Sequence, residues 1–119
     1  MKALVIDDEP AMRALVSSIL QEAGYEVREA ADGRIGLAAF NTFEPDLVIT
    51  DIVMPNEEGI GTIRQLRQLK PDLKIIAISG GGRMGNMDFL RIAKDFGAAA
   101  TLAKPFRKQQ FLDVLKTLG

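Results

Sequence analysis

Short apolar segments alternate with longer amphipathic segments along this chain. Segments of four to six residues that are apolar or weakly alternating predict strands rather than helices. Segment 47–50 carries only apolar or β-branched side chains, as expected for a strand covered on both faces. Segment 25–30 alternates weakly, which favours a strand near the sheet edge. The predicted strands are residues 3–6, 25–30, 47–50, 74–78 and 98–102.

The amphipathic segments between these strands predict helices. Pro10 suits the first turn of a helix, Asp8 or Glu9 is placed to cap it, and Gly24 ends it. Residues 32–33 predict a turn before the second helix. The apolar face of the first helix consists of Met12, Leu15, Val16, Ile19, Leu20 and Ala23. The other predicted helices are residues 35–43, 60–69, 87–96 and 106–118.

Several predicted strands end in a polar residue with useful chemistry. Alternating strands and helices are typical of βαβ units and a parallel sheet. In an open parallel sheet, ligands bind beyond the carboxyl ends of the strands. We therefore expect these polar residues to converge at one sheet edge. They are Asp7 and Asp8, Asp51, Ser79, and Lys104 with Pro105.

Each of these residues also has a local explanation. Asp7 and Asp8 could cap a helix, Asp51 and Ser79 could be turn residues, and Lys104 could be a solvated surface lysine. As a set, three clustered carboxylates repel one another and favour a hard cation such as Mg²⁺. A carboxylate beside Mg²⁺ can attack phosphorus, and a lysine and a hydroxyl can stabilise the phosphoryl oxygens. The set therefore indicates phosphoryl transfer onto Asp51.

The composition removes several other kinds of site. The 119 residues include no Cys and no His, which excludes disulfides, thiolate metal sites and Ser-His-Asp triads. The formal net charge of −1 gives no sign of direct nucleic-acid binding. The apolar run before Asp7 is too short for a signal peptide, and no run has membrane-spanning length. We expect one cytoplasmic domain over residues 1–119, without membrane contact.

Four motifs carry a resemblance to a known family. Residues 7–10, residues 51–55 with Gly59, Ser79, and residues 104–106 resemble the receiver domain of two-component response regulators, in the same order. The resemblance extends over essentially the whole chain. It implies a flavodoxin-like, doubly wound α/β fold of the (βα)5 type, a three-layer sandwich with five parallel strands in the order 2-1-3-4-5. We expect a single receiver domain over residues 1–119 with no output domain of its own, either a stand-alone regulator or an excised domain.

The resemblance implies a role for each site residue. Asp51 accepts a phosphoryl group from a phosphohistidine on a sensor histidine kinase or a histidine phosphotransfer protein. Ser79 and Lys104 bind the phosphoryl group, and a cis bond before Pro105 holds the lysine. The domain then switches contacts with a downstream protein and is not a turnover enzyme. The implied Mg²⁺ ligands are Asp7, Asp8, Asp51 and the backbone carbonyl of Val53.

Two features depart from the family pattern. Thr101 stands where the family usually has a Tyr or Phe ring that moves inward on phosphorylation. The switch formed by Ser79, Thr101 and Pro105 therefore lacks its aromatic part. The segment between Ser79 and Lys104 is also longer than the resemblance implies, with the extra length in residues 80–86. This is either a tolerated loop insertion or a remodelled partner surface.

Two other functions compete with the phosphorylated receiver. A degenerate receiver would bind proteins without being phosphorylated. A Mg²⁺-dependent phosphatase would also use an aspartyl phosphate, but such enzymes usually carry a second Asp two residues after the nucleophile, where this chain has Val53. A P-loop is disfavoured because residues 80–85 are not followed by Lys and Ser or Thr.

In the family that the chain resembles, two positions tune the lifetime of the phosphorylated state. Val53 and Gly81 lie two residues after Asp51 and Ser79, and neither side chain can orient an attacking water. We expect slow self-dephosphorylation, at the long-lived end for the family. Intact-mass measurements over time, without an added phosphatase, test this, and a half-life of seconds would contradict it.

Overall fold

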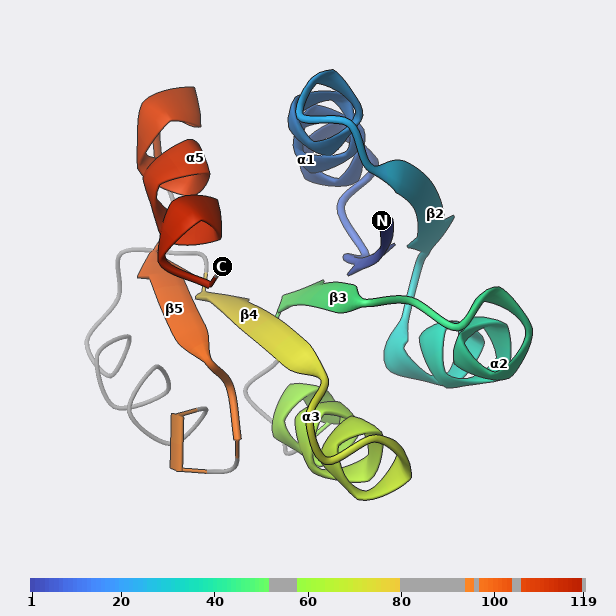
Figure 1. The fold of residues 1–119 in the computed structure, drawn as a ribbon. Helices are drawn as coiled ribbons and strands as arrows, with labels where there is room; N and C mark the ends of the chain where they lie inside the picture. Colours follow the sequence, from blue (N-terminus) through green and yellow to red (C-terminus); the bar gives the residue numbers. More distant parts are fainter. Residues whose placement is uncertain (52–57, 80–93, 96, 104–105, 119) are drawn as a thin grey trace.

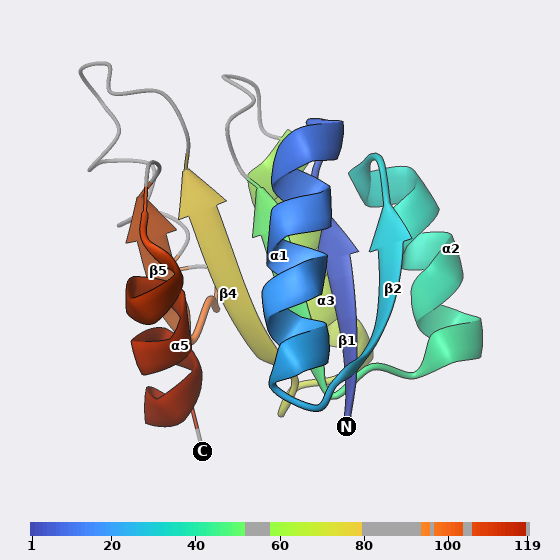
Figure 2. The same ribbon diagram turned by 90° about the horizontal axis from the view of Figure 1, so that it is seen from above.

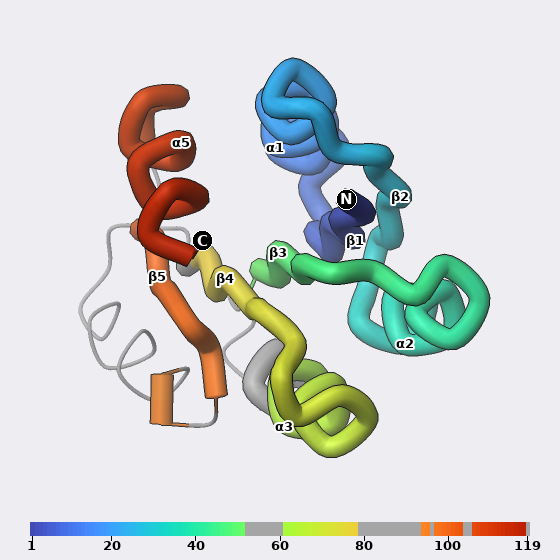
Figure 3. The backbone as a smooth tube through the Cα atoms, viewed as in Figure 1, coloured from blue at the N-terminus to red at the C-terminus, as the bar shows by residue number. Residues whose placement is uncertain are grey.

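The computed structural model describes residues 1–51, 58–79, 94–95, 97–103 and 106–118, with the backbone alone at 58–60 and 79. Five parallel strands form one sheet in the order β2-β1-β3-β4-β5, as predicted (Figure 1 and Figure 3). The strands are β1 (Lys2–Ile6), β2 (Glu26–Ala30), β3 (Leu47–Asp51), β4 (Lys74–Ser79) and β5 (Ala100–Ala103). Within the described residues, the helices are α1 (Pro10–Glu22), α2 (Gly33–Phe43), α3 (Glu58–Leu69) and α5 (Lys108–Thr117).

The helices cover both faces of the sheet, which makes a doubly wound three-layer fold. Helices α1 and α5 lie on one face, and α2 and α3 lie on the other (Figure 1). On the face covered by α1 and α5, the exposed Lys108 of α5 forms an ion pair with Glu22 of α1. Among the described residues, no helix combines the length and apolar character needed to cross a bilayer.

The alternation of side chains along each inner strand supplies two hydrophobic cores. In β1, Leu4 and Ile6 join the core under α2 and α3, whereas Ala3 and Val5 join the core under α1 and α5. All four are at most 4% exposed. Full burial of one such large side chain stabilises the fold by about 1.5–3 kcal/mol. Strand β3 is likewise buried on both faces, as its apolar composition predicted.

Strand β2 lies at one edge of the sheet, as its weak alternation predicted, and it pairs with β1 alone among the described strands. Its burial pattern is mostly exposed until Ala30. All five strands point in the same direction, and both chain ends lie at the opposite end of the sheet (Figure 2). Met1 and Leu118 line the same small cavity there, of about 110 Å³.

The buried face of α1 agrees with the prediction only in part. Val16, Ile19 and Leu20 are buried as expected, but Leu15 is 46% exposed, Ala23 is exposed beyond the end of the helix, and Ser17 is buried although it was not predicted. Helix α1 packs against the edge strand β2 as well as against β1, and this rotates its buried face toward Ser17. Within the part of the chain that the structure describes, the side-chain hydroxyl of Ser17 has no hydrogen-bond partner.

The helix starts also differ from the predicted ones. Residues 32–33 do not form a separate turn, because Asp32 caps α2 by accepting a hydrogen bond from the Ile35 N–H at 2.8 Å and Gly33 is already helical. The last helix begins at Lys108 rather than at residue 106. The N–H of the residue before it, Arg107, is bonded to the Gln110 side chain at 2.7 Å. The predicted helix over residues 87–96 falls largely outside the described residues.

Glycines allow α2 to approach its neighbours closely. A Cβ atom at Gly33 would lie 2.2 Å from Oγ1 of Thr62 on α3. A Cβ atom at Gly36 would lie 2.4 Å from Cδ1 and 2.8 Å from Cγ1 of Ile6. Ile6 is 4% exposed and surrounded by the core, so it has little room to move away.

We predict that Gly36→Ala destabilises the protein by about 1–3 kcal/mol, because the added methyl group overpacks the contact with Ile6. The matched control is Gly61→Ala in α3, where nothing lies within 4 Å of an added Cβ. This control is expected to stabilise the protein by about 0.5–1 kcal/mol. Urea unfolding measures both free energies, and equal shifts in the two variants would contradict the close packing of α2.

Candidate acidic site

Parallel pairing places the ends of β1 and β3 side by side. Ile6 pairs with Thr50, so the next residues along the two strands, Asp7 and Asp51, lie at the same level of the sheet. The N–H of Asp7 continues the ladder on the other side, with a 3.0 Å hydrogen bond to the carbonyl of Ala30. The backbone thus fixes where the acidic residues meet.

Three carboxylates meet at this edge. Oxygen atoms from Asp7, Asp8 and Asp51 all lie within 4.8 Å of one another. Asp7 is 4% exposed, Asp8 is exposed and Asp51 is partly buried. Two unit charges at such a separation repel by about 0.9 kcal/mol even at the dielectric constant of water. The cluster is therefore electrostatically unfavourable on its own.

The donor set of this cluster fits a small, hard cation. All three side chains offer carboxylate oxygens, the ligands that Mg²⁺ prefers. Opposite ligands of Mg²⁺ are about 4.2 Å apart, which is close to the spread of the cluster. Asp7, Asp8 and Asp51 could therefore hold Mg²⁺ together, directly or through water.

The loop after β1 is ordered by hydrogen bonds to Asp7. Its Oδ1 accepts a bond from the N–H of Glu9 at 2.9 Å. Glu9, one of the two predicted capping residues, is the N-cap of α1, but its side chain makes no capping bond. Instead, the buried Asp7 carboxylate orders the loop by accepting the hydrogen bond from the Glu9 N–H.

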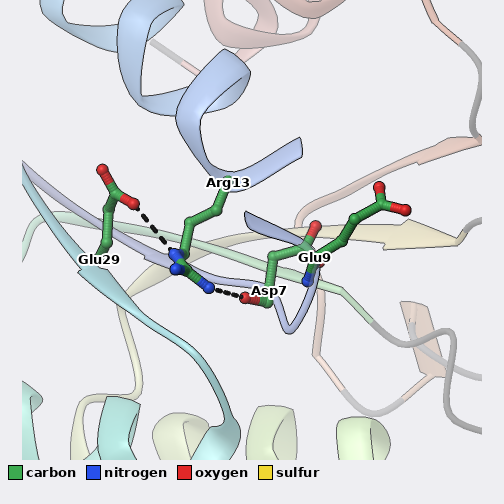
Figure 4. Close-up of polar contacts among 4 residues, drawn as sticks. All are labelled: Asp7, Glu9, Arg13 and Glu29. Carbon is green, nitrogen blue, oxygen red and sulfur yellow. Dashed lines mark hydrogen bonds and ion pairs between the residues drawn. The ribbon is translucent and has the colours of Figure 1, made fainter. Parts of the chain in front are cut away.

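The predicted set did not include Arg13 and Glu29. The guanidinium of Arg13 donates from Nη1 to the carbonyl oxygen of Asp7 at 2.7 Å and from Nε to Oε1 of Glu29 at 3.0 Å (Figure 4). The contact joins α1, β2 and the end of β1. The partners are 16 residues apart in the chain, and no local pattern marks them as a pair.

The structure describes only some of the other predicted site residues. Ser79 is the last residue of β4 and pairs with Ala103, the residue before Lys104, which is consistent with a shared sheet edge. Thr101 pairs with Ala77 and is partly buried. Four predicted residues lie outside the described part of the chain: Val53, Gly81, Lys104 and Pro105.

Comparison with known proteins gives one consistent result. Residues 3–116 match the family model described as "Response regulator receiver domain". The chain is 34% identical to the chemotaxis protein CheY of Thermotoga maritima over 119 residues, which covers 99% of this chain and 97% of that protein. It is 28% identical to the sporulation initiation phosphotransferase F of Bacillus subtilis, covering 97% of this chain and 90% of that protein.

Solved structures give the same result for the fold. The crystal structure of the receiver domain of NtrX from Brucella abortus superimposes with a TM-score of 0.88 at 33% sequence identity. The superposition covers 98% of this chain and 96% of that chain.

We predict that Asp8→Asn weakens Mg²⁺ binding by about tenfold or more, because it removes one charged ligand. Without divalent cations the same variant is expected to be more stable than the wild type, by on the order of 1 kcal/mol, since repulsion is relieved. Calorimetric titration and thermal unfolding measure the two effects.

Asp8 suits this test because it is exposed, whereas Asp7 is buried and organises the loop. The matched control is Asp72→Asn, at an exposed turn residue. Equal Mg²⁺ affinity of wild type and Asp8→Asn would contradict a cation site in the cluster.

Proposed function

The chain belongs to the response regulator receiver domain family, and we propose that it is a phosphoacceptor that receives a phosphoryl group on Asp51. The observation that carries this proposal is the meeting of Asp51 with Asp7 and Asp8 at the end of β3, within 4.8 Å. Receiver domains act in two-component signalling with histidine kinases or phosphotransfer proteins. The proposed donor is therefore a phosphohistidine of such a partner.

The proposed reaction is an in-line transfer between two proteins. A carboxylate oxygen of Asp51 forms a bond to phosphorus while the bond between phosphorus and the imidazole nitrogen of the donor breaks. The electron pair of the broken bond returns to the imidazole. These 119 residues contain no His, so the proposed phosphohistidine lies outside them.

Receiver domains are generally Mg²⁺-dependent, and the acidic cluster gives Mg²⁺ a place to bind. Asp7, Asp8 and Asp51 would hold it, with the backbone carbonyl of Val53 as a further proposed ligand. When bound, the cation neutralises charge on the phosphoryl oxygens. Lys104 and Ser79 are the proposed partners of those oxygens, by resemblance to the family.

The proposed output is a change in protein contacts. Phosphorylation would draw Ser79 inward, with Thr101 and Pro105 completing the switch region and no aromatic ring at position 101. The downstream partner is a protein, reached without direct contact with nucleic acid or membrane, and the proposed location is the cytoplasm. The domain assists its own phosphorylation and its slow dephosphorylation, and we do not assign it substrate turnover.

We predict that the wild-type protein gains one phosphoryl group when it is incubated with Mg²⁺ and a small phosphodonor such as acetyl phosphate. Asp51→Asn is expected to gain none, because the amide is not a nucleophile toward phosphorus. Asp72→Asn, which removes an exposed carboxylate of a distant turn, is the matched control and should react as the wild type does. Intact-mass spectrometry gives the readout.

The outcomes also separate the alternative functions. No added phosphate on the wild type would favour a degenerate receiver that binds proteins independently of phosphorylation. Phosphate added equally to Asp51→Asn would assign the acceptor to another residue. Sustained hydrolysis of a generic phosphate ester would favour the phosphatase.

A further inference from the structure

The side chain of Arg13 connects three elements next to the acidic cluster. Arg13 lies in the first turn of α1, and its guanidinium bonds both the carbonyl of Asp7 and the carboxylate of Glu29 on β2 (Figure 4). The side chains of Arg13 and Glu29 are 20% and 43% exposed. Because a guanidinium is a rigid planar fork, two bonds to two different elements fix its orientation.

The carbonyl that Arg13 binds belongs to the peptide bond between Asp7 and Asp8. This peptide unit is planar, so holding its oxygen also sets the direction in which the chain enters Asp8. The other groups of Asp7 are held as well, since its N–H bonds Ala30 and its Oδ1 accepts from Glu9. Arg13 therefore acts on the link that orients the first two carboxylates relative to each other.

The positive charge of Arg13 cannot by itself favour the binding of a cation to the cluster. A positive charge beside the cluster repels an incoming cation, so removing it should strengthen cation binding. Glu29 balances that charge, and the bond to Asp7 goes to a neutral backbone carbonyl. The pair thus supplies directed hydrogen-bond donors with little net charge.

We propose that Arg13, itself held by Glu29, is a positioning residue for the divalent-cation site of Asp7 and Asp8. This role rests on one part of the proposed function, namely that the acidic cluster binds a divalent cation. It links the edge strand β2, which carries Glu29, to the geometry of the site. Residues that orient metal ligands from outside the coordination sphere typically change metal affinity by about 10–100-fold.

The test is direct binding of Mn²⁺, followed by the electron paramagnetic resonance signal of the free ion. Arg13→Met is expected to bind Mn²⁺ about tenfold more weakly than the wild type. The matched control is Arg67→Met on α3, because the guanidinium of Arg67 also donates two hydrogen bonds, in this case to the backbone carbonyls of Pro71 and Gly97. Its Mn²⁺ affinity should stay within about twofold of the wild type, since it binds no part of the loop after β1 that carries the cluster.

A second variant keeps the inference testable if Arg13→Met folds poorly. Arg13→Lys retains the charge but replaces the rigid planar fork with an ammonium on a flexible stem, whose donors do not hold the two partners in a fixed geometry. We expect it to lose about three- to tenfold in Mn²⁺ affinity, whereas a role through charge alone predicts no change. Thermal unfolding without metal reports the stability of each variant separately.

The results distinguish the two proposals. Unchanged or tighter Mn²⁺ binding by the folded Arg13 variants, with binding by the wild type intact, would overturn the positioning role and leave the proposed function standing. A wild-type protein that binds no divalent cation would instead refute the proposed cation site itself.

Discussion

The parallel pairing of β1 with β3 is the constraint on which the site depends. It brings Asp7 and Asp51 level with each other, and Asp8 follows at once. The carboxylates repel, but the ladder between the two strands holds the backbones of Asp7 and Asp51 next to each other. Both strands are buried on both faces, and that burial exceeds the repulsion by a wide margin. The fold therefore holds the charges in an arrangement that a bound cation would relieve.

Packing behind the sheet supports the same edge. Ile6 immediately precedes Asp7, and it fills the space that Gly36 leaves on α2. Gly33 does the same for Thr62, so α2 lies close to both β1 and α3. The position of the last β1 residue before the acidic pair is thus set by side-chain packing as well as by backbone hydrogen bonds. Ile6 thus connects the packing of the core to the position of the site.

Much of the architecture was predictable because the relevant signals are local. The mainly apolar β3 and the weakly alternating β2 show their central and edge positions in their own sequences. Sequence reasoning also correctly predicted that Asp7, Asp8 and Asp51 lie together, because the carboxyl ends of parallel strands share one edge of the sheet. The strand order, by contrast, came from the family resemblance and not from any periodicity.

The features that sequence reasoning missed depend on tertiary contacts. The burial of Ser17 in place of Leu15 is set by how α1 lies against β2, which helical spacing does not contain. The bond between Arg13 and Glu29 joins residues that local patterns treat as ordinary polar positions. Asp32, expected in a turn, caps a helix. The same residue type is favoured in both settings, so sequence alone does not separate them.

The two chain ends lie near each other and on the side of the domain away from the acidic cluster. Met1 and Leu118 line one small cavity, and they lie at the end of the sheet away from the acidic cluster (Figure 2). Ends that lie close together can be joined, or grafted into a loop of a host protein, with little distortion of the fold. In such a circular permutant or inserted cassette, the connection would leave the face that carries the three carboxylates open to a partner.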